Sequence, residues 1–310
     1  MKIVLTGATG FIGKELCLKL KEKGNSLVVL TRDIHKAKKR LGDLVEAVEW
    51  DAKTLGDWVK YVDGSDAVIN LTGESIGGES IIPSRWTKSK KEKIVNSRVD
   101  STRVIVSAIK KAQSKPKVLI NASAVGYYGH VEEDDVTESY KAGNDFLAET
   151  AKKWEIEAAN AENLGLRVVR MRSGIVLAKH GGAFRRLIIP FRFFIGGTFG
   201  SGKQWFPWVH LQDEINAFIF LLENEKINGA VNVSAPQIVR MKEFCKALGN
   251  AMKRPSIIPV PSFALKIALG EMSDLLLKGQ KVIPEKLLEN GYKFLFPEIE
   301  DALNNILQKN

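Results

Sequence analysis

The sequence predicts an α/β protein: a Rossmann-type, doubly wound parallel sheet with a smaller, mainly helical C-terminal lobe. Three observations predict it. A buried strand at residues 3–5 leads through closely spaced glycines into a helix at 15–23. Strand and helix patterns then alternate through the first seventy residues, as expected for parallel βαβ units. The last third of the chain reads as helices separated by prolines.

The first turn has the composition of a phosphate-binding loop. Gly7, Gly10 and Gly13 recur at three-residue spacing directly after the strand. Such a turn lets backbone amides approach a phosphate, and the helix that follows adds partial positive charge from its N-terminus. The alternative is an ordinary glycine-containing turn. We predict that a dinucleotide contacts this turn through Gly7, Thr9, Gly10, Phe11, Ile12 and Gly13.

The composition is typical of a globular protein without a membrane-spanning helix. The 310 residues are 45% hydrophobic with a mean hydropathy of −0.09, and no apolar run reaches the roughly 18 residues of a membrane span. No targeting segment is visible before the first strand, so we expect a cytoplasmic protein. Cys17 and Cys245 lie far apart and read as small core residues. The four histidines lack metal-ligand spacing, so no metal is predicted.

The net charge of +10 comes from a lysine-rich sequence with basic clusters at residues 36–40 and 88–93. Solvated helix faces explain these clusters best, and an anionic ligand such as a dinucleotide phosphate comes second. No helix-turn-helix, zinc or aromatic-basic motif accompanies the charge, so we do not predict nucleic-acid binding.

The second strand, at residues 26–30, ends in Arg32 and Asp33. In this architecture an acidic residue here binds the ribose 2′-hydroxyl of NAD, whereas an arginine accommodates the 2′-phosphate of NADP. Arg32 lies 25 residues after Gly7, and Asp33 falls just past the expected position. We therefore predict NADP(H), the alternative being a surface arginine. Asp51, at the end of a third strand at 45–50, joins the predicted cofactor-binding residues.

The remaining elements follow the same alternation. We expect a short helix at 57–61, a strand at 67–71, a long helix ending near Lys111, a strand at 118–122, a helix at about 144–163 and a strand at 166–171. Later helices are expected at 213–223, 242–251, 262–270, 273–277 and 298–307. The predicted Rossmann domain comprises residues 1–172 and about 209–236. The predicted substrate lobe comprises about 173–208 and 237–310.

Several motifs resemble the extended short-chain dehydrogenase/reductases, in their nucleotide-sugar epimerase-like branch. They are the glycine turn, residues 70–73 (Asn-Leu-Thr-Gly), and Ser123 followed by Tyr128-Gly129. Residues 73–76, 85–87, 97–102, 123–129, 208–210 and 270–284 resemble one uncharacterised subgroup of that branch, which carries a C-terminal domain of unknown function. The resemblance implies a Rossmann fold, a nicotinamide cofactor contacted by Leu71, Thr72, Gly73 and Ser123, and a catalytic role for Ser123.

The chain departs from the parent family at the proton relay. Those enzymes use a Tyr-x-x-x-Lys pair on the helix after the fifth strand, where the lysine and the cationic nicotinamide favour the tyrosine phenolate. No tyrosine of this chain has a lysine four positions later, and the best alignment puts Leu147 and Ala151 in the two places. Tyr128, in the loop after Ser123, is the first candidate to replace the tyrosine; a packing role is the alternative.

The substrate side of the site is predicted from the same loop and from a glycine-rich segment. Tyr127 follows the fifth strand, and residues 200–205 combine glycines with Lys203 and Trp205. An anionic, partly planar ligand would suit these groups, and a mobile basic loop is the alternative. His210 is interpreted as a structural histidine.

Two functions remain open from the sequence. The first is an NADP-dependent oxidoreductase or epimerase acting on a small carbonyl or hydroxyl compound. The second is a regulatory or scaffold protein that binds NADP(H) without hydride chemistry. The resemblance favours the first function, and the missing Tyr-Lys pair favours the second. A homodimer is possible in either case.

Overall fold

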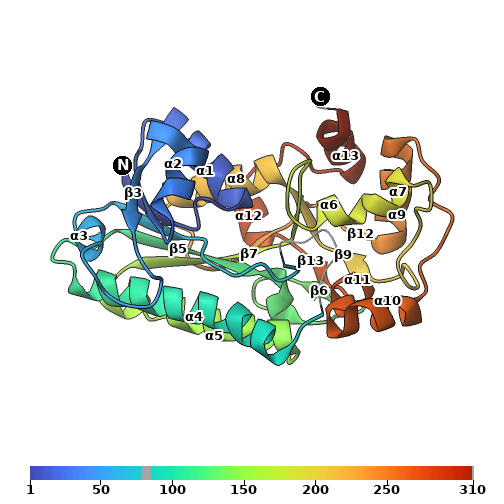
Figure 1. The fold of residues 1–310 in the computed structure, drawn as a ribbon, viewed down its shortest axis with the longest axis horizontal. Helices are drawn as coiled ribbons and strands as arrows, with labels where there is room; N and C mark the ends of the chain where they lie inside the picture. The colour runs from blue at the N-terminus through green and yellow to red at the C-terminus, as the bar shows by residue number, and fades with distance from the viewer. Residues whose placement is uncertain (79–84, 309–310) are drawn as a thin grey trace.

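The centre of the molecule is a seven-stranded sheet in which every neighbouring pair is parallel (Figure 1). This computed structural model describes residues 1–78 and 85–308. The strand order is β11-β7-β5-β4-β1-β2-β3. The strands span β1 Lys2–Thr6, β2 Ser26–Thr31, β3 Glu46–Glu49, β4 Ala67–Asn70, β5 Val118–Ala124, β7 Arg167–Ser173 and β11 Gly229–Val233. The predicted doubly wound α/β fold is confirmed.

Helices cover both faces of this sheet. On one face lie α1 (Phe11–Glu22), α2 (Ile34–Leu41) and α8 (Leu211–Glu223), whose apolar side chains share one core with the sheet. On the other face lie α3 (Val59–Val62), α4 (Lys88–Lys111) and α5 (Phe146–Ala159). Figure 1 shows α4 and α5 side by side beneath the sheet. Burial on both faces explains why the central strands read as continuous apolar runs.

The C-terminal lobe has a core of its own and extends from one end of the sheet (Figure 1). Its helices are α6 Phe184–Leu187, α7 Ile189–Arg192, α9 Met241–Met252, α10 Ser262–Leu269, α11 Asp274–Leu277 and α13 Ile299–Gln308. Three separate pairs of short strands lie outside the main sheet: β8 (Ile175–Leu177) with β10 (Trp208–His210), β9 (Trp205–Phe206) with β12 (Val239–Arg240), and β6 (Asp135–Val136) with β13 (Lys281–Val282).

Differences from the sequence-based expectation concentrate at element ends and in this lobe. Helix α1 begins at Phe11, directly on the glycine turn, and not at residue 15. Helix α12 (Glu285–Glu289) was not expected, and its Leu287 packs into the core of the main sheet. The two-residue strands were also missed, because a run this short has no readable periodicity. The domain boundaries remain a prediction, and Leu287 and Tyr292, which fall in the predicted substrate lobe, pack in the core of the main sheet.

Within the described ranges, no helix is long and apolar enough to cross a lipid bilayer.

Candidate functional site: a dinucleotide cleft at the carboxyl edge of the sheet

The glycine turn forms a tight cradle between β1 and α1. Gly7 has a φ of +66°, and a Cβ atom there would lie 2.6 Å from the carbonyl oxygen of Leu71. A Cβ atom on Gly13 would lie 2.5 Å from the carbonyl oxygen of Gly7. Gly10 is the N-cap of α1 and supplies no side-chain hydrogen bond, so the first amides of the helix are left to a ligand.

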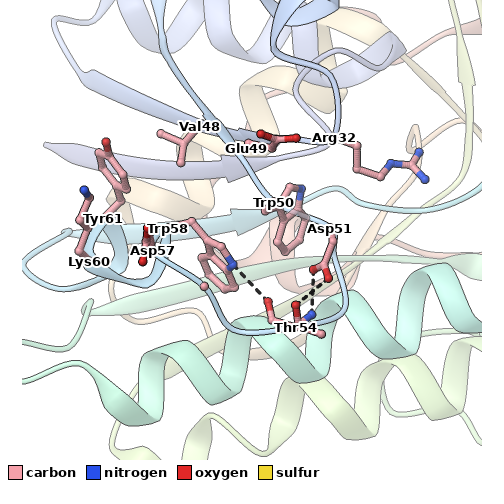
Figure 2. A pocket seen from close by; sticks show the side chains of 11 residues that line it. Arg32, Val48, Glu49, Trp50, Asp51, Thr54, Asp57, Trp58, Lys60 and Tyr61 are labelled. Carbon is pink, nitrogen blue, oxygen red and sulfur yellow. Dashed lines mark hydrogen bonds between the residues drawn. The ribbon is translucent and has the colours of Figure 1, made fainter.

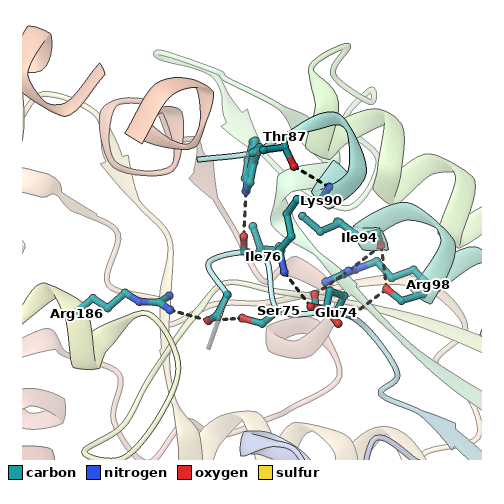
Figure 3. A network of polar contacts seen from close by, with 11 residues as sticks. Glu74, Ser75, Ile76, Thr87, Lys90, Ile94, Arg98 and Arg186 are labelled. Carbon is teal, nitrogen blue, oxygen red and sulfur yellow. Dashed lines mark hydrogen bonds and ion pairs between the residues drawn. The ribbon is translucent and has the colours of Figure 1, made fainter. Parts of the chain in front are cut away.

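The loop after β4 lies beside the glycine turn, and the two line a common cleft. Side chains from α4 and α6 hold this loop in place (Figure 3). Lys90 Nζ lies 2.9 Å from Glu74 Oε1, and Arg186 Nη2 donates to the carbonyl of Gly78 at 2.7 Å. The pKa of Glu74 is lowered, chiefly by its hydrogen bond from Lys90. Thr72 Oγ1 in this loop is buried and has no hydrogen-bond partner among the described residues. The contacts from Lys90 and Arg186 therefore hold the loop in place beside the cleft.

Arg98 was assigned no role from the sequence, yet it lines the cleft from α4. Its Nη1 donates to the carbonyls of Glu74 (3.1 Å) and Ile94 (3.0 Å), and burial lowers its pKa to about 10 (Figure 3). Ile94, Arg98 and Thr102 follow each other at four-residue spacing on the buried face of the helix. That spacing was the available signal for a charge facing the sheet. Arg98 can attract an anionic ligand into the cleft.

A cavity of about 360 Å³ connects these walls. Eight predicted site residues line it: Gly7, Gly10, Phe11, Ile12, Gly13, Leu71, Gly73 and Ser123. Thr9 and Thr72 belong to the same two loops without lining the cavity. Thr9 accepts a hydrogen bond from Arg40 Nη1 at its carbonyl oxygen (2.6 Å).

Arg32 and Asp51 lie at a separate, open hollow at the ends of β2 and β3, of about 760 Å³ (Figure 2). Asp33 caps α2, accepting a hydrogen bond from the amide of Lys36, and so is turned into the helix. The side chain of Asp51 accepts hydrogen bonds from Thr54 and the amide of Lys53, and these lower its pKa to about 2. Arg32 is exposed, and its contact with the ribose end of a cofactor remains a prediction.

Helix α5 carries Leu147, Ala151 and Glu155 at four-residue spacing, and the first two occupy the places expected for the Tyr-x-x-x-Lys pair. Leu147 and Ala151 line the cavity, and Glu155 is one turn further along. Glu155 is buried and forms a two-pronged ion pair with Arg172 on β7, Nε to Oε1 and Nη2 to Oε2 both at 2.8 Å. Two apolar side chains, followed by a carboxylate that is paired with Arg172, thus stand in place of the usual Tyr-Lys relay.

Ser123 and Tyr128 both belong to the hydrogen-bond network of this ion pair. Ser123 Oγ, which lines the cavity, donates to Glu155 Oε1 at 2.6 Å. Tyr128 is almost fully buried; its hydroxyl donates to Asn232 Oδ1 at 2.6 Å and accepts from Arg172 Nη1 at 2.9 Å. Burial raises the pKa of Tyr128 to about 12, so the phenol stays protonated. The geometry gives Tyr128 a positioning role and leaves Ser123 as the hydroxyl in the cavity.

The three residues predicted to bind substrate are not brought together. The ring of Tyr127 lies under the Arg172 guanidinium, 3.5 Å from the ring centroid to Cζ. Lys203 is exposed and lines neither the cavity beside the glycine turn nor the second cavity described in the next sentence. Trp205 lines a second cavity, which shares Gly126 and Leu147 with the first.

Glu214, on α8, is a second residue without a role assigned from the sequence. It is fully buried at the floor of the cofactor cavity, and its Oε1 accepts a hydrogen bond from Ser173 Oγ at 2.6 Å. Its Oε2 has no partner among the described residues. Burial raises its pKa to about 8, so the carboxyl group is neutral at pH 7.

This shift predicts a stability that depends on pH. The folded pKa lies above the unfolded value, so the stabilising effect is complete below about pH 4.5 and is lost as the pH rises through about 8. Glu214→Gln removes the titration. The melting temperature of the variant minus that of wild type should increase from pH 5 to pH 8.5, by about 2 °C for each kcal/mol lost. Thermal melts at both pH values test this; a difference independent of pH contradicts it.

The described residues fit a dinucleotide. The glycine cradle, the uncapped start of α1 and the Arg98 guanidinium converge on one cleft. The cleft lies at the carboxyl edge of a parallel sheet, where open α/β folds bind their ligands. Fold and site define a Rossmann-type dinucleotide-binding protein of the extended short-chain dehydrogenase/reductase class. In residues 1–78 and 85–308 no group of side chains could hold a metal ion.

The chain belongs to the NAD-dependent epimerase/dehydratase family, whose profile matches residues 3–234. Residues 260–306 match DUF1731, a domain of unknown function, which confirms the predicted subgroup. The chain is 40% identical to the chloroplastic SDR39U1 homolog of Arabidopsis thaliana, covering 99% of this chain and 87% of that protein. It is 38% identical to YfhF of Bacillus subtilis, covering 99% and 98%.

A solved structure matches over the whole chain. The human epimerase family protein SDR39U1, crystallised with NADPH, is 31% identical and superposes with a TM-score of 0.88, covering 100% of both chains. The UDP-glucuronic acid 4-epimerase of Bacillus cereus is 20% identical with a TM-score of 0.78, a likeness that shows the fold alone. The comparisons confirm that the cofactor is a nicotinamide dinucleotide, the class predicted from the sequence.

Proposed function

We propose that this protein is an NADP(H)-dependent oxidoreductase or epimerase acting on a small carbonyl or hydroxyl compound. One observation carries the proposal: the glycine cradle and Ser123 line the same cavity, and a second cavity adjoins it at Gly126 and Leu147. The human relative that was crystallised with NADPH supports the choice of cofactor. When bound, the nicotinamide cofactor supplies or accepts a hydride.

The proton has a path through this chain's own residues. Ser123 already donates its hydroxyl proton to Glu155, so its lone pairs are directed toward a substrate hydroxyl. A proton can then move from the substrate oxygen to Ser123 while the Ser123 proton moves to Glu155; reduction of a carbonyl reverses both steps once Glu155 has taken up a proton from water. Tyr128 acts indirectly, because it holds Arg172 and therefore Glu155. In this proposal Ser123 and Glu155 together replace the missing Tyr-Lys relay.

The second candidate is a regulatory protein that binds NADP(H) without turnover. Leu147 and Ala151 favour it, since neither side chain can donate or accept a proton. The cytoplasmic location and the homodimer expected from the sequence remain predictions for either function.

Arg32 tests the choice of cofactor. Charge-assisted hydrogen bonds from Arg32 to the 2′-phosphate, at about 1.5–3 kcal/mol each, give NADPH a roughly ten- to hundred-fold advantage over NADH. Arg32→Ala should reduce this advantage to within about three-fold, without changing the affinity for NADH. Gly10→Val, which places a side chain on the phosphate cradle, should abolish the binding of both. Calorimetric titration of the three proteins with each cofactor tests this; equal wild-type affinities for NADPH and NADH contradict the assignment.

A further inference from the structure

The second cavity lies between the carboxyl edge of the sheet and the C-terminal lobe. Its volume is about 190 Å³, below the roughly 300 Å³ at which pockets for drug-sized ligands begin. It adjoins the cofactor cavity at Gly126 and Leu147, where a Cβ atom on Gly126 would lie 3.6 Å from that of Leu147. A compound of one or two rings fits this space, and a nucleotide sugar does not.

Aromatic rings form the walls. Trp86 and Phe146 meet edge to face with centroids 5.2 Å apart, and Trp205 and Phe206 also line the cavity. Both indole N–H groups are used within the protein: that of Trp86 donates to the carbonyl of Ile76 (3.0 Å), and that of Trp205 to the carbonyl of Glu132 (2.8 Å). A ligand therefore meets apolar ring surface and no free indole N–H group; on Trp205 only one ring face is open, because the Arg240 guanidinium lies over the other with its Cζ 3.4 Å from the centroid.

The charges around this cavity disfavour an anion. Its described lining carries the carboxylates of Asp145, Glu271 and Asp274, and its one ammonium group, Lys278, lies 2.8 Å from Asp274. Lys91, nearby, is paired with Glu271. A phosphate entering here would meet carboxylates and would have to compete for cations that already have partners.

We propose that this cavity binds a small, uncharged aromatic aldehyde or ketone, or the alcohol formed from it by reduction, and rejects nucleotide sugars. The inference rests on the proposed function and replaces the anionic ligand expected from Lys203. The reaction balances on the groups already named. A hydride passes between the carbon bearing the oxygen and the nicotinamide, and a proton passes between that oxygen and Glu155 through Ser123.

Shape-matched probes test the class of ligand. Calorimetry on the NADP⁺ complex, which cannot reduce a ketone, compares neutral 2-acetylnaphthalene with 2-naphthoate and 2-naphthyl phosphate. UDP-glucose is the fourth probe. We expect the ketone to bind at least ten-fold more tightly than the phosphate, 2-naphthoate to fall between them, and UDP-glucose to show no binding.

Two sets of variants localise the effect. Glu271→Gln with Asp274→Asn should raise the affinity for 2-naphthoate about three- to ten-fold and leave that for the ketone unchanged. The control Glu300→Gln with Asp301→Asn makes the same change in charge on exposed residues of α13 and should alter neither affinity. Leu275→Trp, which fills the cavity from its exposed side, should abolish ketone binding while NADPH binds as in wild type.

The outcomes separate this inference from the proposed function. Tighter binding of 2-naphthyl phosphate or UDP-glucose than of the ketone overturns the inference. So does absence of ketone binding in a protein that binds NADP⁺. Unchanged ketone binding in Leu275→Trp overturns the location. Failure to bind NADP⁺ or NADPH at all instead refutes the proposed function.

Discussion

Replacing Arg172 by Met is expected to lower the free energy of unfolding by about 3–5 kcal/mol, the largest stability effect that the structure predicts. Arg172 and Glu155 are each 5% exposed as side chains, and both guanidinium–carboxylate contacts are 2.8 Å. Without the arginine, the buried Glu155 carboxylate keeps only the Ser123 hydrogen bond. Equilibrium unfolding in urea measures the change.

A matched control lies on the outer surface of α5. Arg103 and Glu157 join α4 to α5 at 2.7 Å, but the Arg103 side chain is 55% exposed. Arg103→Met should therefore cost only about 0–1 kcal/mol. Arg172→Met with Glu155→Leu should recover part of the loss, because the second change removes the unpaired charge. A cost below about 1 kcal/mol for Arg172→Met alone would show that Glu155 finds another partner.

Ser123→Ala is expected to lower kcat/KM by about a hundred- to ten-thousand-fold, the usual effect of removing a positioned proton donor or acceptor. Only the hydroxyl is lost, so the affinity for NADPH should change little. Tyr128→Phe should reduce the rate about ten-fold or less, because Tyr128 reaches the site only through Arg172. Oxidation of NADPH across aldehydes, ketones, quinones and nucleotide sugars identifies a substrate, and steady-state kinetics then compares the three proteins.

Ser101→Ala is the matched control, because this buried serine of α4 bonds only within its helix and lines neither cavity. It should leave kcat/KM unchanged. Fast turnover by Ser123→Ala would show that the proton moves elsewhere. Tight NADPH binding without turnover of any compound would favour the regulatory function.

Local sequence determined the sheet and the phosphate cradle. Continuous β-branched and apolar runs mark strands buried on both faces, and the three glycines mark the turn between β1 and α1. Both signals lie within a few residues, so they could be read without knowing the fold. The same reading found Ser123 at the end of β5 and showed that α5 lacks the Tyr-Lys pair.

The tertiary structure decided which polar groups are available for chemistry. Tyr128 reads as a candidate base from its place after Ser123, but Asn232 and Arg172, 104 and 44 residues away, occupy its hydroxyl. Lys203 reads as a substrate cation, yet the adjoining cavity is walled by aromatic rings and carboxylates from distant segments.

The physical reason is that a side chain's charge is fixed by its type, whereas its pairing and burial depend on residues far along the chain. Glu214 illustrates both limits. The sequence places it one residue after Asp213 on an ordinary helix, and only packing beneath the cavity floor raises its pKa to about 8. The sequence thus determined the fold and the glycine turn between β1 and α1, and the packing of distant segments determined which groups near that turn are free to bind a ligand or move a proton.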